Sequence, residues 1–173
     1  MFLKSDLLYL RALESSDLEF LYQLENKVAV WQVSNTVTPY SRELLQLYLE
    51  NIAADIYTTK QLRLVICSLK HEMVGVIDLY DFEPLHRRAG IGIIIQETYR
   101  QQHYATHALT LLLTYCQNHL LLHQVYCTIM ASNPASLKLF RNATFSEVGI
   151  RKQWIKTSQG WEDVYELQKI LFS

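Results

Sequence analysis

The sequence is poor in glycine, proline and cysteine. Five glycines and three prolines among 173 residues leave few turn signals, and no linker rich in these residues divides the chain. We therefore predict long elements and one domain spanning residues 1–173, because a chain of this length ordinarily folds around one core. Three widely spaced cysteines, Cys67, Cys116 and Cys127, favour buried reduced thiols over a disulfide framework.

Charge of one sign is also lacking. Lysine and arginine total 16, aspartate and glutamate total 17, and the formal net charge is −1. Nucleic acids and anionic membranes bind clustered positive charge, so neither is an expected partner. The longest apolar runs, such as Ile91–Ile95 and Leu109–Leu113, fall far short of the roughly 20 residues that cross a bilayer. Because Met1–Leu10 carries no signal-peptide pattern, we predict a cytoplasmic protein.

The apolar patterning predicts the order of the elements. Apolar runs and alternations predict strands, and apolar residues three and four apart predict helices. Antiparallel strands followed by a strand–helix–strand crossover indicate a mixed α+β sheet. In chain order we expect strand Leu7–Ala12, a helix capped by Ser15–Asp17, a helix from Ser41 to Ile52, strands Leu62–Leu69, Met73–Tyr80 and Ala89–Gln96, helix Tyr104–Leu121, strand Gln124–Met130, helix Asn133–Asn142, and a hairpin of Phe145–Ile155 with Trp161–Leu171.

The stretch Ile91–Ala108 runs from an apolar strand through a polar turn into a helix. The first N–H groups of a helix lack partners within it and lie at the positive end of the helix dipole. Such a junction can hold a diphosphate, although from spacing alone a plain connection is the simpler interpretation. At a second junction, Asn133 is placed to cap the helix that Pro134 begins.

Three acids, Asp78, Asp81 and Glu83, lie near the end of one predicted strand. Such a cluster can receive a cationic amine or take its proton, although a solvated strand end is the simpler interpretation from these residues alone. His103 and His107 stand four apart, a spacing that can hold a metal on one helix face. No HExxH pattern accompanies them, so we predict no metal site.

Taken in order, these stretches resemble the GNAT N-acetyltransferases over nearly the whole chain, nearest the bacterial spermidine and ribosomal-protein-alanine acetyltransferase branch. Any one match is weak, and their order and spacing together carry the resemblance. The matching segments are Leu10–Leu13 with Ser16–Leu18, His86–Ala89 leading into Gly92–Ile95, Tyr99–Thr106 at the place of the R-G-x-G-Y-A-T acetyl-CoA loop, and Asn133, Ser136, Leu139 and Phe145 at the N-x-x-S-x-x-L signature and the phenylalanine after it.

The resemblance implies a GNAT-type α+β fold, with a mixed, mostly antiparallel sheet that splays at its centre and is flanked by helices. It implies that a primary amine, on a small molecule or a peptide N-terminus, attacks the thioester of acetyl-CoA directly, without a metal. Asp78 or Asp81 would orient or deprotonate that amine. The implied acetyl-CoA site comprises Ile93, Ile94, Ile95, Arg100, Gln101, Gln102, His103, Tyr104, Ala105, Thr106, Asn133, Ser136 and Phe140.

The sequence departs from the family pattern at several positions. Gln101, His103 and Thr144 stand where the family has glycine, and Phe140 stands where a tyrosine often protonates the leaving thiolate. A catalytically weak, acyl-CoA-binding regulatory relative is therefore the alternative function. The uncharged stretch Gln32–Thr36 argues against spermidine, because a polycation needs several carboxylates to offset its desolvation. The apolar tail hairpin leaves a homodimer open.

Overall fold

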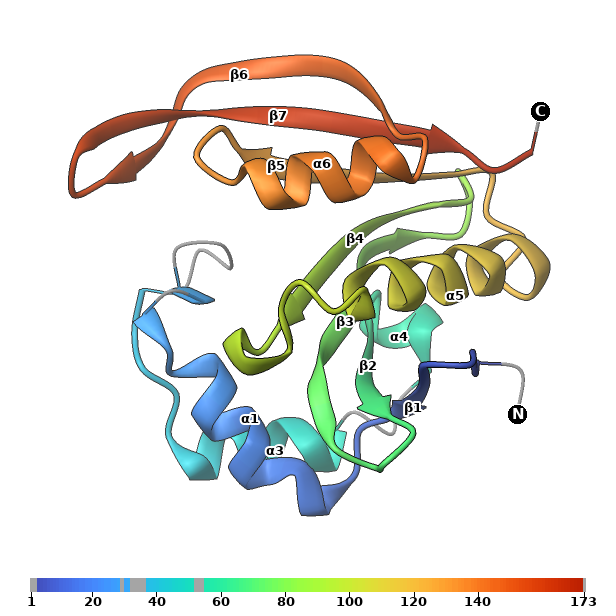
Figure 1. Ribbon diagram of the computed structural model, residues 1–173, viewed down its shortest axis with the longest axis vertical. Helices are drawn as coiled ribbons and strands as arrows, with labels where there is room; N and C mark the ends of the chain where they lie inside the picture. The colour runs from blue at the N-terminus through green and yellow to red at the C-terminus, as the bar shows by residue number, and fades with distance from the viewer. Residues whose placement is uncertain (1–2, 29, 32–36, 52–54, 173) are drawn as a thin grey trace.

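The computed structural model describes residues 3–28, 30–31, 37–51 and 55–172. Its centre is a seven-stranded sheet in the order β1-β2-β3-β4-β5-β7-β6 (Figure 1). Neighbouring strands run antiparallel except for the parallel pair β4 and β5, so the predicted mixed sheet is confirmed. The strands are β1 (Leu8–Ala12), β2 (Leu62–Ser68), β3 (Met73–Glu83), β4 (Arg88–Ile95), β5 (Gln124–Met130), β6 (Ser146–Thr157) and β7 (Gly160–Ile170).

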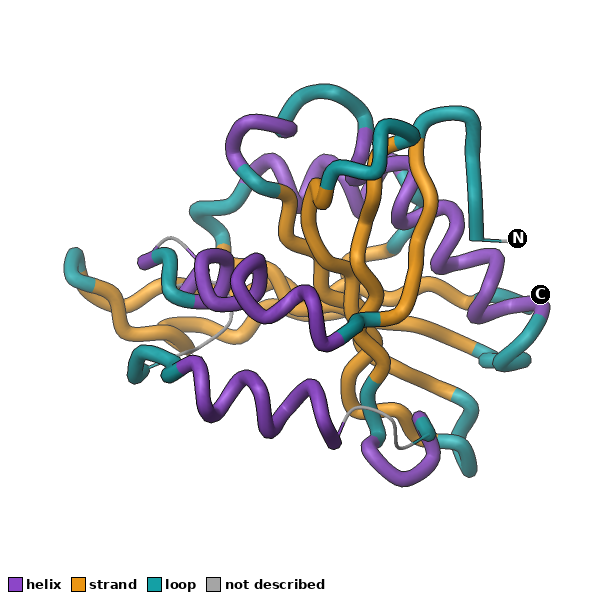
Figure 2. Tube along the Cα trace, turned by 90° about the horizontal axis from the view of Figure 1, so that it is seen from below, coloured by secondary structure: helices purple, strands orange, loops and turns teal. Residues whose placement is uncertain are grey.

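Helices cover both faces of this sheet (Figure 2). They are α1 (Leu18–Glu25), α3 (Arg42–Asn51), α4 (Ile56–Thr59), α5 (Tyr104–Asn118) and α6 (Pro134–Asn142), with short 3-10 turns η1 (Ser15–Asp17) and η2 (Glu97–Tyr99). The sequence did not predict α4, which is short and begins where the Asp55 carboxylate accepts the main-chain N–H groups of Tyr57 and Thr58.

Two apolar clusters form because successive strand residues point to opposite faces. Ile77 and Leu79 of β3 belong to the cluster that α5 and α6 cover. Val76 belongs to the second cluster, which α1 and α3 cover. By the same alternation, Asp78 and Tyr80 lie on the α1/α3 face of the sheet.

The sheet divides where β4 and β5 part. Within the described residues these two strands pair only where Arg88–Gly90 faces Gln124–Tyr126. Beyond that point β4 stays paired with β3 as far as Ile95, and β5 stays paired with β7 as far as Met130. The central splay expected from the sequence is therefore confirmed, and Figure 1 shows β4 turning away from β5.

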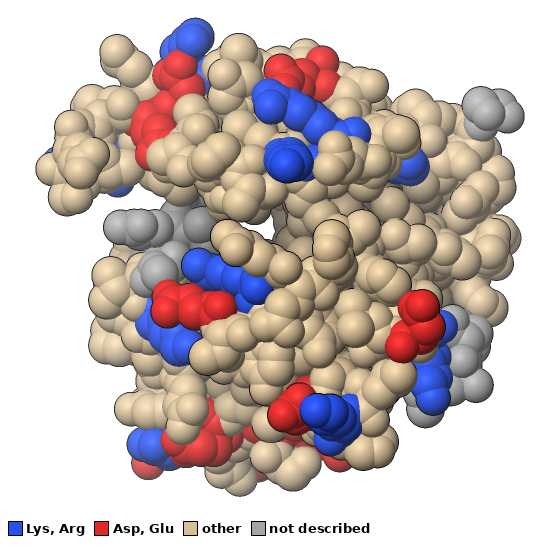
Figure 3. Space-filling model, in the orientation of Figure 1, with Lys and Arg blue, Asp and Glu red and all other residues tan. Residues whose placement is uncertain are grey.

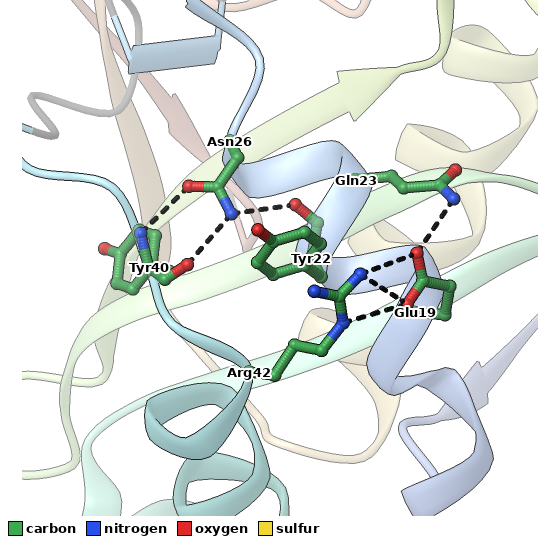
Figure 4. Close-up of polar contacts among 6 residues, drawn as sticks. All are labelled: Glu19, Tyr22, Gln23, Asn26, Tyr40 and Arg42. Atoms are coloured by element: carbon green, nitrogen blue, oxygen red, sulfur yellow. Dashed lines mark hydrogen bonds and ion pairs between the residues drawn. The ribbon is translucent and has the colours of Figure 1, made fainter.

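Polar contacts join the end of α1 to the start of α3 (Figure 4). The Asn26 side chain donates to the carbonyls of Tyr22 and Tyr40 at 3.0 Å each and accepts the Tyr40 main-chain N–H at 2.9 Å. The Arg42 guanidinium lies 3.8 Å from the Tyr22 ring centroid and bonds both oxygens of Glu19, in the first turn of α1. The Asn26 contacts fix the C-terminal end of α1, where Glu25 lies beside the site described next.

Candidate functional site

A cleft of about 430 Å³ lies between the diverging strands β4 and β5. In Figure 3 the surface is hollowed between the part that holds β5–β7 and the part that holds β1–β4. The lining comes from both faces of the sheet, so the cleft passes through it. The α1/α3 face contributes Arg63, Asp78 and Tyr80, and the strands and α6 contribute Ile91–Ile94, Cys127–Met130, Asn133, Ser136, Phe140, Ile155 and Val164.

The turn into α5 is suited to an anion. Within the described chain, none of the main-chain amides of Gln101–Thr106 donates to a protein acceptor. The first turn of α5 carries no acidic residue, so the positive end of the helix dipole is uncompensated there. Arg100 is held close by, with its Nε donating to the carbonyl of Ile95 at 3.3 Å. These groups fit a diphosphate.

The residues that replace the family's glycines share one backbone conformation. Gln101, His103 and Thr144 have φ values of 60°, 65° and 64°. This left-handed region favours glycine, so these three residues adopt a glycine-type conformation with larger side chains. Gln101 and His103 are exposed, and Lys169 donates to the Thr144 hydroxyl and, at 2.7 Å, to the carbonyl of Ala143.

The structure brings most of the predicted acetyl-CoA residues to the cleft or to the turn beside it. Ile93 and Ile94 line the cleft, whereas Ile95 is buried beyond the lining. None of Arg100–Thr106 belongs to the described lining. In the turn that follows β4, Gln102 donates to the Thr98 carbonyl at 3.0 Å, Tyr104 contacts Tyr99 edge-on at 5.9 Å, and Ala105 and Thr106 belong to the first turn of α5.

Helix α6 forms the other wall. Asn133 and Ser136 line the cleft, and the Asn133 side-chain oxygen accepts the Ser136 main-chain N–H at 3.1 Å. The predicted cap is therefore present. Phe140 also lines the cleft and packs edge-to-face on Phe145, with ring centroids 5.0 Å apart. No hydroxyl stands at that place on the helix, because residue 140 is phenylalanine.

The two predicted catalytic acids differ in position. Asp78 lines the cleft, and both of its oxygens accept from Arg63, at 2.8 and 2.9 Å. Asp81 is exposed, has φ of 48°, accepts the Tyr126 hydroxyl at 3.4 Å and does not line the cleft. Of the two, Asp78 is therefore the one placed to meet an acceptor.

Residues 8–146 match the family model described as an acetyltransferase (GNAT) domain. The chain belongs to the GNAT acetyltransferases. Its curated relatives include the spermidine N(1)-acetyltransferase of Vibrio cholerae serotype O1, 29% identical over 147 residues that cover 82% of this chain and 80% of the relative. The enzyme of the same name from Escherichia coli K12 is 30% identical over 142 residues, which cover 81% of this chain and 73% of that one.

The fold of this GNAT enzyme agrees with that of solved relatives. The Vibrio cholerae spermidine N-acetyltransferase, crystallised with CoA and spermine, superposes with a TM-score of 0.86 at 26% identity and covers 95% of both chains. This GNAT enzyme therefore transfers the acetyl group of acetyl-CoA to an amine nitrogen. In the part of the chain that the structure describes, no group of three or more metal-ligating side chains is assembled. No described helix is long and apolar enough to cross a membrane.

Two charged residues that the sequence did not single out stand at the GNAT site: Arg63 lines the cleft, and Glu25 lies behind it, outside the lining. Arg63 forms ion pairs with Asp78 on one side and with the buried Glu25 at the end of α1 on the other. Burial lowers the pKa of Arg63, but the attraction of Asp78 and Glu25 outweighs it and raises this pKa above the ordinary value. Two carboxylates and one guanidinium leave one net negative charge at this end of the cleft.

Proposed function

We propose that the β4–β5 cleft is the active site and that the acceptor is an aliphatic polyamine of the spermidine class. The observation that carries the proposal is the passage of the cleft through the sheet. On one side the cleft is lined by Asn133 and Ser136 of α6, and the unpaired amides follow directly after the end of β4. On the other side it is lined by Arg63 and Asp78, which belong to a net-negative charge cluster. Acetyl-CoA would then occupy the α5/α6 side, and the amine would approach from the α1/α3 side.

On the acetyl-CoA side, the amides of Gln101–Thr106 hold the diphosphate together with Arg100. Asn133 and Ser136 border the pantetheine arm. Main-chain groups of Ile93–Ile95 pair with that arm and polarise the thioester carbonyl, as fixed hydrogen-bond donors do wherever negative charge develops. The unpaired state of these amides supports the assignment, because an anion satisfies several of them at once.

On the acceptor side, Asp78 positions the amine. Its two oxygens are engaged by Arg63, so the carboxylate serves as an electrostatic anchor, and water carries the amine proton away. The names of the relatives support a polyamine. The uncharged stretch Gln32–Thr36, which disfavours spermidine, lies outside the described residues, whereas the buried Glu25 adds a carboxylate beside Arg63.

Thiol release measured with an amine panel tests this function. We expect spermidine to give a kcat/KM at least roughly tenfold above propylamine or a peptide N-terminus, because a second cationic group gains from the cluster. Asp78→Asn should raise the KM for spermidine roughly tenfold, since a hydrogen bond to a charged group contributes about 1.5–3 kcal/mol. The Kd of acetyl-CoA should stay unchanged, and Asp81→Asn, outside the cleft, serves as the matched comparison.

Each negative result points to a different error. If acetyl-CoA binds by calorimetry but no amine releases thiol, the chain is the acyl-CoA-binding regulatory relative. If all amines react equally, the polyamine assignment is wrong. If Asp78→Asn leaves turnover unchanged from roughly pH 6 to pH 9, Asp78 does not anchor the acceptor.

The chain is also proposed to act as a cytoplasmic homodimer. Three buried free cysteines, Cys67, Cys116 and Cys127, support a reducing compartment. The β6–β7 hairpin, called the arm below, extends beyond the rest of the chain in Figure 1. It exposes the apolar residues Val148, Ile150, Trp154 and Trp161, and a Vibrio cholerae relative with the same fold is a dodecamer.

A further inference from the structure

The thiolate that leaves during acetyl transfer needs a hydrogen-bond donor, and Phe140 offers none. A fixed donor at the point where charge develops is among the largest contributions to catalysis. Among the residues that the structure describes, three hydroxyl groups remain in the lining of the cleft, those of Tyr80, Thr128 and Ser136. Their positions in the fold separate them.

The side chain of Tyr80, a residue of β3, lies across β4 at the point where β4 and β5 separate. Its cross-strand partner on β4 is Gly90, and a Cβ atom added to Gly90 would lie 2.2 Å from the Tyr80 Cε2. The ring therefore lies directly on the Gly90 main chain. Gly90 is also the last β4 residue that pairs with β5. The next glycine, Gly92, leaves the Asp78 carboxylate and the Tyr80 ring side by side, since a Cβ there would stand 3.9 and 4.0 Å from them.

The hydroxyl of Tyr80 reaches β5. The Tyr126 ring meets the Tyr80 ring edge-on, with centroids 5.9 Å apart. Burial raises the pKa of Tyr80 to about 12, and a hydrogen bond from the Thr128 side chain lowers it in part. The Tyr80 hydroxyl therefore keeps its hydrogen across the neutral pH range, and it belongs to a side chain that lines the cleft.

We infer that Tyr80 donates the hydrogen bond to the departing CoA sulfur that residue 140 cannot donate in this enzyme. The inference rests on the proposed placement of the active site. The amine lone pair forms the C–N bond, the C–S bond breaks, and its electron pair stays on sulfur. The Tyr80 O–H bonds this thiolate without transferring its proton. The proton released by nitrogen passes to water, and the free thiol, of pKa about 8.5, is protonated from solvent.

Ser136 is less well placed for this role. It stands in the first turn of α6, one helical turn before Phe140, and its main-chain N–H is bound by the Asn133 cap. Tyr80 instead adjoins Asp78, the residue proposed to anchor the acceptor. In the tetrahedral intermediate the amine nitrogen and the CoA sulfur are bonded to the same carbon, so a donor next to the acceptor anchor lies close to the C–S bond that breaks.

Tyr80→Phe tests the inference, because phenylalanine keeps the ring on Gly90 and removes only the hydroxyl. We expect kcat to fall roughly 10- to 100-fold, as loss of a hydrogen bond to a charged group implies. The Kd of acetyl-CoA by calorimetry and the KM of the amine should change less than about threefold, because the lost hydrogen bond forms only in the transition state. Tyr57→Phe removes a hydroxyl from an exposed tyrosine of α4 outside the cleft and should match the wild type.

A double-mutant cycle adds a readout that a structural role would not produce. Phe140→Tyr restores the hydroxyl typical of the family and should raise kcat much more in the Tyr80→Phe background than in the wild type. Equal gains in both backgrounds would overturn the inference. A Tyr80→Phe variant with a kcat within about twofold of the wild-type value would also overturn it. A fall with Ser136→Ala but not with Tyr80→Phe would assign the role to Ser136. A wild type that binds acetyl-CoA and releases no thiol would refute the proposed function itself.

Discussion

At the scale of single residues, two strained positions lie in the turn into α5. Gln101 and His103 both hold left-handed φ values, and a residue with a Cβ atom in this conformation costs about 1–2 kcal/mol. The turn keeps this shape although neither residue is glycine. It follows that the surrounding strand and helix over-determine the conformation of the turn.

His103→Gly should therefore leave acetyl-CoA affinity equal or better and stabilise the fold by about 0.5–1 kcal/mol, because relief of strain exceeds the added chain entropy. Calorimetry with acetyl-CoA and urea unfolding measure the two effects. Gln102→Gly is the matched control, since Gln102 is not among the left-handed residues and should lose stability. A tenfold loss of affinity in His103→Gly, equivalent to about 1.4 kcal/mol, would show instead that the imidazole binds phosphate.

Sequence reasoning located the residues of the turn but missed the charge cluster. The turn follows from a local pattern, a strand running directly into a helix, and the resemblance to the family's acetyl-CoA loop assigned Gln101–Thr106 to the cofactor. Glu25 meets Arg63 only because α1 packs on β2 across a long stretch of chain. One signal was present: Glu25 follows Leu18 by seven residues and Leu21 by four, which places an acid on the apolar face of its helix.

At the scale of elements, apolar runs predict β2, β4 and β5 to within one residue, whereas β3 runs on to Glu83, three residues past its predicted end. The starts of α3, α5 and α6 also agree to within one residue, and the start of the first helix does not. The predicted cap Ser15–Asp17 is instead the 3-10 turn η1, whose N-cap is Glu14. This turn is closed by the buried Asp17, which accepts the Glu14 main-chain N–H at 2.8 Å and pairs with Arg11.

Asp17→Asn should lower the free energy of unfolding at pH 7 by about 1–3 kcal/mol, the range for a buried charge-assisted hydrogen bond. Burial raises the pKa of Asp17, but the hydrogen bonds from Arg11 and Glu14 outweigh it and lower this pKa overall. The stabilisation is thus complete above the unfolded pKa of about 3.9 and is lost as pH falls through the lower folded pKa.

Urea unfolding at neutral and at acid pH measures this difference. The gap between the wild type and Asp17→Asn should close toward acid pH. Glu19→Gln is the matched control, because the Glu19–Arg42 pair is 58% and 54% exposed and such pairs stabilise little. A gap that is constant over the whole pH range would show that Asp17 acts through shape and not through its charge.

At the scale of the whole molecule, the sheet consists of two halves joined where β4 meets β5. The half made of β5, β6 and β7 carries the arm, and β6 is the edge strand. Two register shifts interrupt its pairing with β7, which makes this edge a poor template for adding another strand. Association through the arm must therefore use side chains. The arm lies outside the cleft except for Ile155 and Val164.

Trp161, which is 62% exposed on β7, is the best candidate for the centre of such an interface, because buried tryptophans often dominate association energies. We expect the wild type to sediment as a dimer or larger assembly and Trp161→Glu to shift it toward the monomer, weakening association at least roughly 30-fold, about 2 kcal/mol. Leu85→Glu alters an apolar residue that is 80% exposed in the β3–β4 loop and should leave the assembly intact.

If both variants dissociate alike, the effect comes from the added charge and not from loss of the tryptophan. If the wild type is already monomeric at micromolar concentration, the arm serves another purpose. Since Ile155 and Val164 link the arm to the cleft, a true interface predicts that thiol release per chain falls together with dissociation in Trp161→Glu and remains normal in Leu85→Glu.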